Sequence, residues 1–219
     1  MIKAPNLAVA TSWEDRIADL GGIPSSRILL DPLPGDASAE DLIRVRQQLG
    51  KLCELIDGAL VEKAMGWQES LLAAVLVQWL NNFLDNHHLG VATGADGLTR
   101  LFGDTIRGPD VSFIAWDRLP GGVLPTEPIP HLVPNFVIEV LSVCNTYGEM
   151  SRKRREYFQA GVELVWMVDP RRRTIAVYRT ALDVSVLSEG EKIDGGRILP
   201  GWEVDLGQLF GKLDQRKEP

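Results

Sequence analysis

The chain has 219 residues, of which 45% are hydrophobic, 24% charged and 7% aromatic, as in ordinary folded proteins. This composition excludes an intrinsically disordered or fibrous chain, and the length suits one globular domain rather than two large ones. The net charge of −7 argues against a protein that coats nucleic acid non-specifically, so any site for a polyanion has to be local.

Neither membrane insertion nor secretion is expected. No window of the sequence approaches the roughly 20 apolar residues of a membrane span. The N-terminal apolar run is too short for a secretory signal. Cys53 and Cys144 match no metal-ligand spacing and favour a reducing compartment. We therefore expect a cytoplasmic protein without a membrane partner.

The N-terminal part differs in character from the rest of the chain. Residues 1–35 contain four prolines and few periodic apolar positions. This pattern is typical of a loosely packed arm, so we expect an N-terminal extension over residues 1–35 and a single domain over residues 36–219.

The domain itself shows alternating helix and strand patterns. It should begin with a short helix that ends at Gly50, a hairpin that turns at Asp57-Gly58, and a long amphipathic helix over 67–88. The segments expected to follow are strands at 89–93, 98–102 and 106–116, a proline-rich loop at 119–134, a buried strand at 136–141, a helix at 148–160, strands at 164–168, 174–178 and 184–187, and a closing segment at 202–210. This order predicts an α/β (α+β) domain with a mixed β-sheet flanked by helices.

Glu139 breaks the pattern of the most apolar strand. The strand expected at 136–141 is apolar on both faces, as in a central strand covered on each side, yet this carboxylate lies in its middle. A buried, unpaired carboxylate costs several kcal/mol, so Glu139 must meet a cation, a metal or several donors, or stay protonated. The strand pattern is equally consistent with a buried ion pair and with a metal or catalytic site.

Asp110 favours the second interpretation. It follows Pro109 and precedes an apolar run, which is also the position of a turn cap. If the two strands are neighbours, Asp110 and Glu139 converge at one edge of the sheet and offer the hard oxygen ligands that Mg²⁺ or Mn²⁺ prefers. The main-chain carbonyl of Val140 would be a further metal ligand.

Three more charged residues border the expected core. Glu69 lies at the start of the long helix on its apolar face, where helix capping and a place in the site explain it equally well. Lys153 and Arg154 fall on either side of the apolar stripe of the helix at 148–160, and periodicity does not choose between them as the cation of the site. Tyr157, one turn after Lys153, is expected in the core with its hydroxyl at the rim of the site.

The main local excess of positive charge lies between residues 152 and 179. Eight cations outweigh three anions there, a local charge of +5. The cations are Arg152, Lys153, Arg154, Arg155, Arg171, Arg172, Arg173 and Arg179. Such a run is often only a solvated face, so its charge alone does not establish a nucleic-acid site.

Three segments together resemble a known family. They are GALVEKAMGWQESLLAAVL, IRGPDVSFIAWDRLP, and the stretch from PNFVIEVLSV to RRRTIAVY, which ends at residue 178. In this order they resemble the Uma family of putative restriction endonucleases, part of the PD-(D/E)xK nuclease superfamily. The resemblance covers roughly residues 50–210 and implies a restriction-endonuclease-like core.

The resemblance also implies roles for individual residues. It makes Asp110 and Glu139 the acidic metal ligands and Lys153 the catalytic lysine, although the superfamily usually places lysine where this chain has Leu141. Glu69 matches an acidic position on the first core helix, where it would hold a second metal or a water. Glu54 matches a recurrent glutamate of unclear role. Arg152, Arg154 and Arg155 would neutralise phosphates that flank the cleaved bond.

The function implied is hydrolysis of DNA phosphodiester bonds by an endonuclease that uses Mg²⁺ or Mn²⁺. A homodimer is expected because paired sites suit a two-fold substrate. One alternative is a catalytically inactive module of the same fold that binds nucleic acid or protein, since a fold does not guarantee a function. Another is a metal hydrolase that acts on a small phosphate ester.

Overall fold

The structure, a computed structural model, describes residues 12–214. Its helices are α1 (Trp13–Asp19), α2 (Ala39–Leu49), α3 (Trp67–His87), α4 (Tyr147–Ala160) and α5 (Leu206–Phe210), with short 3-10 turns at Ser25–Arg27, Trp116–Arg118, Pro120–Gly122 and Gly211–Leu213. Its strands are β1 (Cys53–Ile56), β2 (Ala59–Glu62), β3 (Gly90–Gly94), β4 (Thr99–Phe102), β5 (Thr105–Arg107), β6 (Val111–Ala115), β7 (Phe136–Val140), β8 (Leu164–Asp169), β9 (Thr174–Tyr178), β10 (Val184–Ser188), β11 (Lys192–Gly195) and β12 (Leu199–Asp205).

A six-stranded sheet forms the centre of the molecule. Its strand order is β10-β9-β8-β7-β6-β3. Neighbouring strands are antiparallel except β7 and β8, which run parallel. Parallel neighbours need a crossover connection, and α4 provides it. The crossover therefore places α4 beside β7, the strand that carries Glu139.

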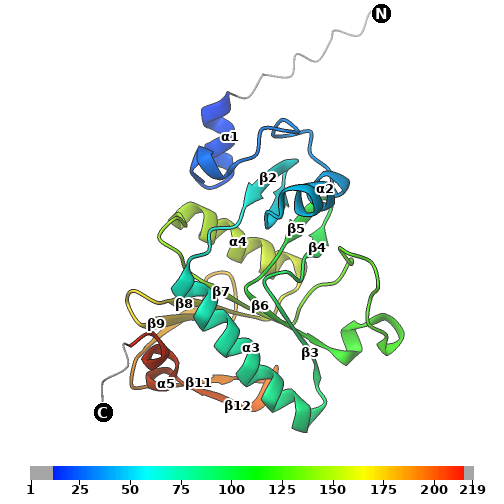
Figure 1. The fold of residues 1–219 in the computed structure, drawn as a ribbon. Coiled ribbons are helices and arrows are strands. Elements are labelled where there is room, and N and C mark those ends of the chain that lie inside the picture. The colour runs from blue at the N-terminus through cyan, green and yellow to red at the C-terminus, as the bar shows by residue number, and fades with distance from the viewer. Residues whose placement is uncertain (1–11, 215–219) are drawn as a thin grey trace, which may run out of the picture.

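The two faces of this sheet are covered by different helices (Figure 1). Phe136, Ile138 and Val140 of β7 pack in one core with α3, α5 and the β11–β12 hairpin. Val137, between them, belongs to the core on the opposite face, where α4 packs. Because successive strand residues point to opposite faces, Glu139 shares the α4 face with Val137.

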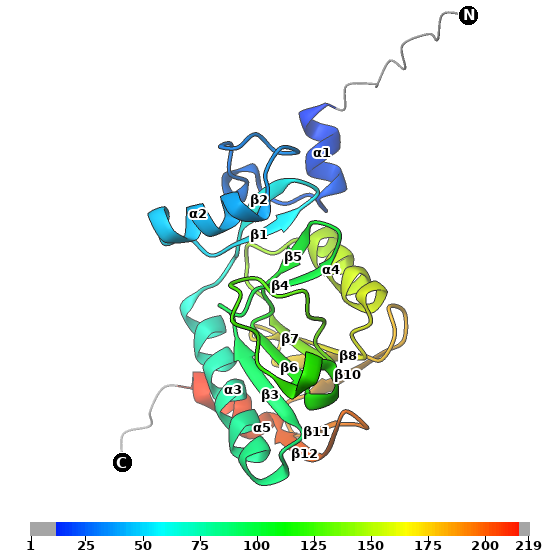
Figure 2. The ribbon, with the colours of Figure 1, turned by 90° about the vertical axis from the view of Figure 1, so that its right-hand side faces the viewer.

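A second, four-stranded sheet lies next to the first, with α2 packed on it (Figure 2). Its strand order is β2-β1-β5-β4. The strand expected at 106–116 is thus wrong as a single element, because β5 belongs to the small sheet and β6 to the large one. Pro109 has no N–H group to donate to a ladder, so the chain changes sheet at residues 108–110.

Part of the predicted extension is packed in the structure. Leu20, Ile23 and Ile28 are buried and form a core with residues of β1 and β2. The expectation of loose packing is therefore wrong for residues 20–28. Three apolar residues pack there against the small sheet, although their spacing follows neither a helical nor a strand period. The division of the chain at residue 35 stays a prediction.

The predicted fold class is confirmed: mixed strands form sheets that are flanked by helices. Strand β11 is not predicted by the sequence pattern, and the closing segment expected at 202–210 contains part of β12 followed by α5. Within residues 12–214, no helix is long and apolar enough to cross a bilayer.

Candidate active site

Asp110 and Glu139 are brought together where the two sheets meet. The antiparallel register of β6 and β7 pairs Val111 with Ile138, and its continuation places Asp110 opposite Glu139. Residues opposite each other in a ladder share a face of the sheet. The backbone N–H of Val140 donates to Oδ2 of Asp110 at 2.8 Å, which fixes this carboxylate beside β7. The predicted convergence of the two acids is present in the structure.

Helix α4 supplies the groups that contact Glu139. The ammonium group of Lys153 lies 2.9 Å from Oε2 of Glu139, and the Tyr157 hydroxyl donates to the other carboxylate oxygen. All three side chains are buried. The geometry therefore selects Lys153 over Arg154 as the cation beside the strand acid. It also places the Tyr157 hydroxyl inside the cluster rather than at its rim.

Glu54 and Arg107 connect this cluster to the small sheet. Oε1 of Glu54 lies 2.9 Å from Lys153 Nζ and accepts the backbone N–H of Gly108 at 3.0 Å. Its Oε2 accepts from Arg107 at 2.7 Å, and Arg107 also donates to Glu156 at 2.8 Å. Arg107 is only 1% exposed, and among the described residues these two glutamates are its ion-pair partners.

Lys63, which the sequence analysis missed, contacts Asp110. Its ammonium group lies 2.9 Å from Oδ1 of Asp110 and donates to the carbonyl of Gly108. The side chain is 5% exposed although the residue stands in the connection between β2 and α3. No hydrophobic period singles it out; the only available signal is a cation directly after an apolar strand.

Burial and charge set the protonation of the cluster. Burial is the main factor that raises the pKa of Glu139, and the neighbouring carboxylates of Asp110 and Glu54 raise it further; Lys153 opposes them, and the pKa is about 7. For Lys153, burial lowers the pKa of the ammonium group, but the attraction of Glu139 and Glu54 exceeds this effect and raises it. The protein thus stabilises the charged form of Glu139 poorly, while Lys153 stays protonated.

Glu69 lies apart from these contacts. It belongs to the first turn of α3, and an ideal Cβ added to Gly66 would come within 2.4 Å of its Oε2. The carboxylate thus lies over the N-cap residue of its own helix. Among the described residues, no hydrogen bond or ion pair joins Glu69 to Asp110 or Glu139. Its place in the first turn, where the helix dipole favours a carboxylate, supports a structural role at the helix start, and a role in the site stays a prediction.

The three arginines predicted to bind phosphates lie in different environments. Arg152 is held by Asp57 at 2.6 Å and by Glu156 at 2.7 Å. Arg154 lies over the ring of Tyr178, with its guanidinium carbon 4.4 Å from the ring centroid. Arg155 is exposed on the outer side of α4. Of these three arginines, Arg154 and Arg155 form no ion pair with another described residue, whereas Arg152 does.

The donor set suits a magnesium ion that keeps part of its water shell. Among the residues that the structure describes, no three acidic, histidine or cysteine side chains gather as a metal-binding group. Asp110 and Glu139 provide two carboxylates, and Val140, which follows Glu139 in the chain, holds Asp110 through its N–H group. Mg²⁺ is commonly held by one or two carboxylates together with waters and substrate phosphate, so a larger protein cage is not required.

Comparisons with known proteins agree with this architecture. A solved structure described as "a putative nuclease belonging to DUF820" from Anabaena variabilis ATCC 29413 superimposes with a TM-score of 0.66 at 22% sequence identity. The match covers 74% of this chain and 90% of that one, and it shows a shared fold. No curated protein matches the chain.

The family model named Uma2, described as "Putative restriction endonuclease", matches residues 39–207. This match includes Glu54, Lys63, Asp110, Glu139 and Lys153, the charged residues that meet at the junction of the two sheets. It confirms the resemblance found in the sequence and begins within α2. Because it covers well over half of the sequence, the chain belongs to the Uma2 family of putative restriction endonucleases.

Proposed function

We propose that the protein is a metal-dependent endonuclease that hydrolyses phosphodiester bonds in DNA. The observation that carries this proposal is the position of Asp110 opposite Glu139 on adjacent strands, with Lys153 bound to Glu139. Two carboxylates and a lysine on one face form a set able to bind a cation and a phosphate together. Membership of a family described as restriction endonucleases supports DNA as the substrate.

The proposed ligands of Mg²⁺ or Mn²⁺ are the carboxylates of Asp110 and Glu139 and the carbonyl of Val140. A bound divalent ion would polarise the phosphate and lower the pKa of a coordinated water. Lys63 now pairs with Oδ1 of Asp110, so this oxygen becomes a metal ligand only if the lysine moves away. Oδ2 is held by the amide of Val140 and keeps the carboxylate in place.

The roles of the remaining residues follow from their contacts. The raised pKa of Lys153 keeps it protonated, because the attraction of Glu139 and Glu54 exceeds the effect of burial, so it acts as a charge and not as a base. It would orient the attacking water and offset charge on the phosphate. Tyr157 holds the second oxygen of Glu139 and is a positioning residue. For Glu69 we propose contact with a water or a second ion, as the resemblance implies.

Arg154 and Arg155, with Arg152, are the proposed contacts to phosphates that flank the cleaved bond. Arg152 would serve only after exchanging its partners Asp57 and Glu156. One such site cleaves one strand, so cleavage of both strands calls for a second copy of the chain. We propose a homodimer on this ground.

An inactive module that binds nucleic acid is the second candidate, and one observation favours it. The carboxylates of both Asp110 and Glu139 are already paired with lysines, Lys63 and Lys153 respectively. These buried ion pairs stabilise the acids without a metal. The two candidates differ in a simple result, because the module would retain DNA but release no product with any divalent ion.

The test is incubation of the purified protein with supercoiled plasmid and with single-stranded DNA in Mg²⁺, Mn²⁺ or chelator. We compare wild type with Asp110→Asn and Glu139→Gln, which keep the shape of each side chain. Glu203→Gln is the matched control, because Glu203 is an exposed strand glutamate in β12. Circular dichroism verifies the fold of each variant.

The proposal expects metal-dependent cleavage by wild type and the control, and a loss of about 100-fold or more in either site variant. This loss corresponds to the several kcal/mol that a correctly held metal contributes to phosphoryl chemistry. Equal cleavage by wild type and Glu139→Gln would contradict it. DNA retention without product from folded wild type would favour the inactive module.

A further inference from the structure

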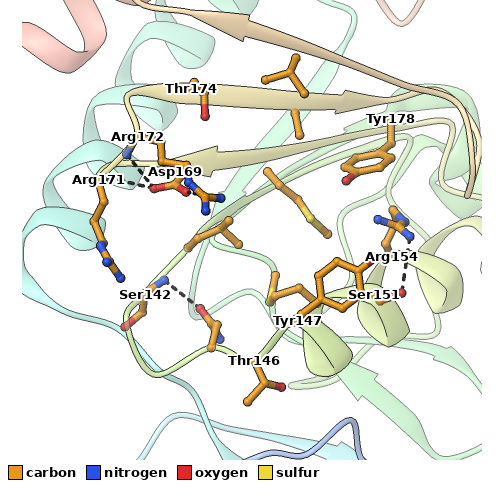
Figure 3. Close-up of a pocket in the computed structure, with 16 residues that line it drawn as sticks. Ser142, Thr146, Tyr147, Ser151, Arg154, Asp169, Arg171, Arg172, Thr174 and Tyr178 are labelled. Atoms are coloured by element: carbon orange, nitrogen blue, oxygen red, sulfur yellow. Dashed lines mark hydrogen bonds and ion pairs between the residues drawn. The ribbon is translucent and has the colours of Figure 1, made fainter.

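A cavity of about 630 Å³ lies on the α4 side of the six-stranded sheet. Its volume falls within the roughly 300–1,000 Å³ of pockets that bind small organic ligands. One wall is the first half of α4, and the other is formed by β9, β10 and the turn between β8 and β9 (Figure 3). None of the residues assigned to metal binding or hydrolysis lines it.

The floor of this cavity continues outward from the candidate active site. Glu139 pairs with Met167, Met167 with Ala176, and Ala176 with Val186 across three successive strand pairs. Residues paired in this way share a face of the sheet, and neighbouring strands are about 4.8 Å apart. The floor thus extends from about 5 to about 15 Å from Glu139. A stacked strand advances about 3.4 Å per nucleotide, so this distance spans about one to four nucleotides from a bound phosphate.

Aromatic and apolar side chains line much of the cavity. Tyr147, the first residue of α4, is 86% exposed and stands at the rim. Tyr178 lies at one end with the guanidinium group of Arg154 over its ring (Figure 3). Met150 and Met167 are buried residues of the lining and add apolar surface. A flat ring can be covered here on both faces, since aromatic rings and Met side chains both pack on it.

The lining is also positively charged. Arg171 and Arg172 are exposed at the end opposite Tyr178 (Figure 3). The one acid in the lining, Asp169, accepts the backbone N–H groups of both arginines at 3.0 Å, and its other oxygen lies 3.7 Å from the exposed guanidinium group of Arg172. The Nε of Arg154 is buried and has no hydrogen-bond partner among the described residues. Three arginines and an unused donor favour an anionic ligand.

Aromatic faces combined with arginines are what a nucleotide requires. Bases of single strands stack on aromatic side chains while cations neutralise the adjacent phosphates. In a duplex the bases are stacked inside the helix and cannot enter a recess, unless the nucleotide leaves the stack. The ligand that suits this cavity is therefore an unpaired nucleotide.

We propose that this cavity binds an unpaired nucleotide of the DNA strand within a few nucleotides of the cleaved phosphate, with Tyr147 stacked on the base and Arg154, Arg171 and Arg172 at the phosphates. The substrate is then single-stranded DNA, or duplex DNA with an unpaired segment. This inference rests on the proposed function, because Glu139 defines which phosphate is cleaved.

The test measures binding in chelator, so that no cleavage occurs. Fluorescently labelled oligothymidylate is titrated with wild type, Tyr147→Ala and the double variant Arg171→Ala/Arg172→Ala, and a duplex of equal length is titrated in parallel. Trp116→Ala and Arg179→Ala are the matched controls, since Trp116 is a half-exposed aromatic residue and Arg179 an exposed arginine, both outside the cavity lining. Tyr147→Phe retains the ring and should bind as wild type does.

We expect tighter binding of the single strand than of the duplex, and a loss of about fivefold or more in Tyr147→Ala. The double arginine variant should reduce the slope of log affinity against log salt by about 1.4, because each phosphate that an arginine neutralises on a single strand adds about 0.7 to this slope. The inference is overturned if both cavity variants bind the single strand like wild type, or if wild type prefers the duplex.

The same proteins are then assayed for cleavage with Mn²⁺. Normal single-strand binding by the cavity variants, with cleavage that still depends on Asp110 and Glu139, would overturn the cavity inference alone. Cavity-dependent binding by a wild type that never cleaves would overturn the proposed nuclease and leave a binding subsite for unpaired nucleotides.

Discussion

The ammonium nitrogen of Lys153 lies 2.9 Å from Oε2 of Glu139, although the two residues are 14 positions apart in the chain. The chain between them leaves β7, forms a loop and begins α4. The position two residues after Glu139 is Leu141, which is apolar. The position of the lysine in the site is therefore set by the packing of α4 against the sheet, and not by the sequence of strand β7.

Replacing Lys153 by Met should destabilise the protein. The substitution removes the cation that lies 2.9 Å from both Glu54 and Glu139, and leaves these buried carboxylates partly uncompensated. Breaking a buried pair in this way costs about 3–5 kcal/mol of the free energy of unfolding. Urea denaturation of wild type and Lys153→Met measures this loss of stability.

Two further variants show whether charge is the cause. Lys153→Met/Glu139→Gln should recover part of the loss, because the buried carboxylate becomes a neutral amide. Lys192→Met, at an exposed lysine of β11, should change the free energy by no more than about 0.5 kcal/mol. A double variant less stable than Lys153→Met would show that packing and not charge dominates.

Two acids of the candidate site were predictable because they interrupt apolar segments. Glu139 and Asp110 stand where a strand pattern requires apolar residues, and a buried carboxylate needs a partner. The same argument applies to Glu54 in β1 and Arg107 in β5, which are 3% and 1% exposed. The burial of Arg107 is not evident from the sequence, because the pattern over 106–116 predicts one strand and hides the change of sheet at Pro109.

Other features depend on tertiary contacts that no local pattern contains. Lys63 reaches Asp110 across 47 positions of the chain. Arg152 and Arg173 belong to the basic segment, yet each is engaged by two acids, of which only Glu156 lies in the same element as its arginine. Sequence charge counts arginines but does not show which ones are already paired, so the segment looks more uniformly basic than it is.

Gly21→Ala should weaken the attachment of the N-terminal segment to α4. Gly21 has φ of +92°, and a Cβ there would come within 2.4 Å of the Glu149 backbone nitrogen. Gly22 is the matched control, because its φ is +71° but no atom lies within 4 Å of a Cβ. Both substitutions incur about 1–2 kcal/mol of backbone strain, and only Gly21→Ala adds the backbone clash.

Urea denaturation and limited proteolysis compare the two glycine variants. We expect Gly21→Ala to be less stable than Gly22→Ala and to be cleaved faster within residues 12–30. Equal stability and equal cleavage rates of the two variants would show that the N-terminal segment accommodates the added Cβ of Gly21→Ala without loss of stability.

The ion pair of Arg27 with Glu149 should stabilise the protein at neutral pH and not in acid. Burial raises the pKa of Glu149, but hydrogen bonds from Arg27 and Asn145 outweigh it and leave the pKa below its usual value. A carboxyl group with a lowered pKa adds stability above its unfolded pKa of about 4.3, and this stability is lost as the pH falls through the folded pKa.

The measurement is urea denaturation of wild type and Arg27→Ala at pH 7 and at about pH 3. Hydrogen bonds to a charged group contribute about 1.5–3 kcal/mol, and the difference between the two proteins should be of this size at pH 7 and smaller in acid. Arg44→Ala, at a half-exposed arginine of α2, controls for the loss of an arginine. A difference that does not change with pH would exclude the ion pair as its source.

The two cysteines should react with thiol reagents at different rates. Burial raises the pKa of the Cys53 thiol to about 11, whereas Cys144 is exposed. The thiolate is the reactive form, so at pH 8 Cys53 is protonated as well as inaccessible. Mass spectrometry after iodoacetamide treatment should show one label on wild type and none on Cys144→Ser. Label on Cys53 at pH 8 in the folded protein would contradict this.

Lys63→Met should increase the affinity for Mn²⁺ if Asp110 is a metal ligand. The ammonium group lies 2.9 Å from Oδ1 of Asp110 and would compete with a divalent ion for the same oxygen. Two unit charges about 4 Å apart interact by about 4 kcal/mol at an effective dielectric constant of 20, so removing the lysine should tighten binding by about tenfold or more. Isothermal titration calorimetry without DNA measures this independently of cleavage.

The double variant Lys63→Met/Asp110→Asn is the control, because it lacks both the competitor and the ligand and should bind Mn²⁺ more weakly than wild type. Weaker binding by Lys63→Met itself would show that the lysine organises the site rather than competing with the ion. In that case the ion pair between Lys63 and Asp110 would be part of the metal-bound protein, and the metal would have to lie on the Glu139 side of the cluster.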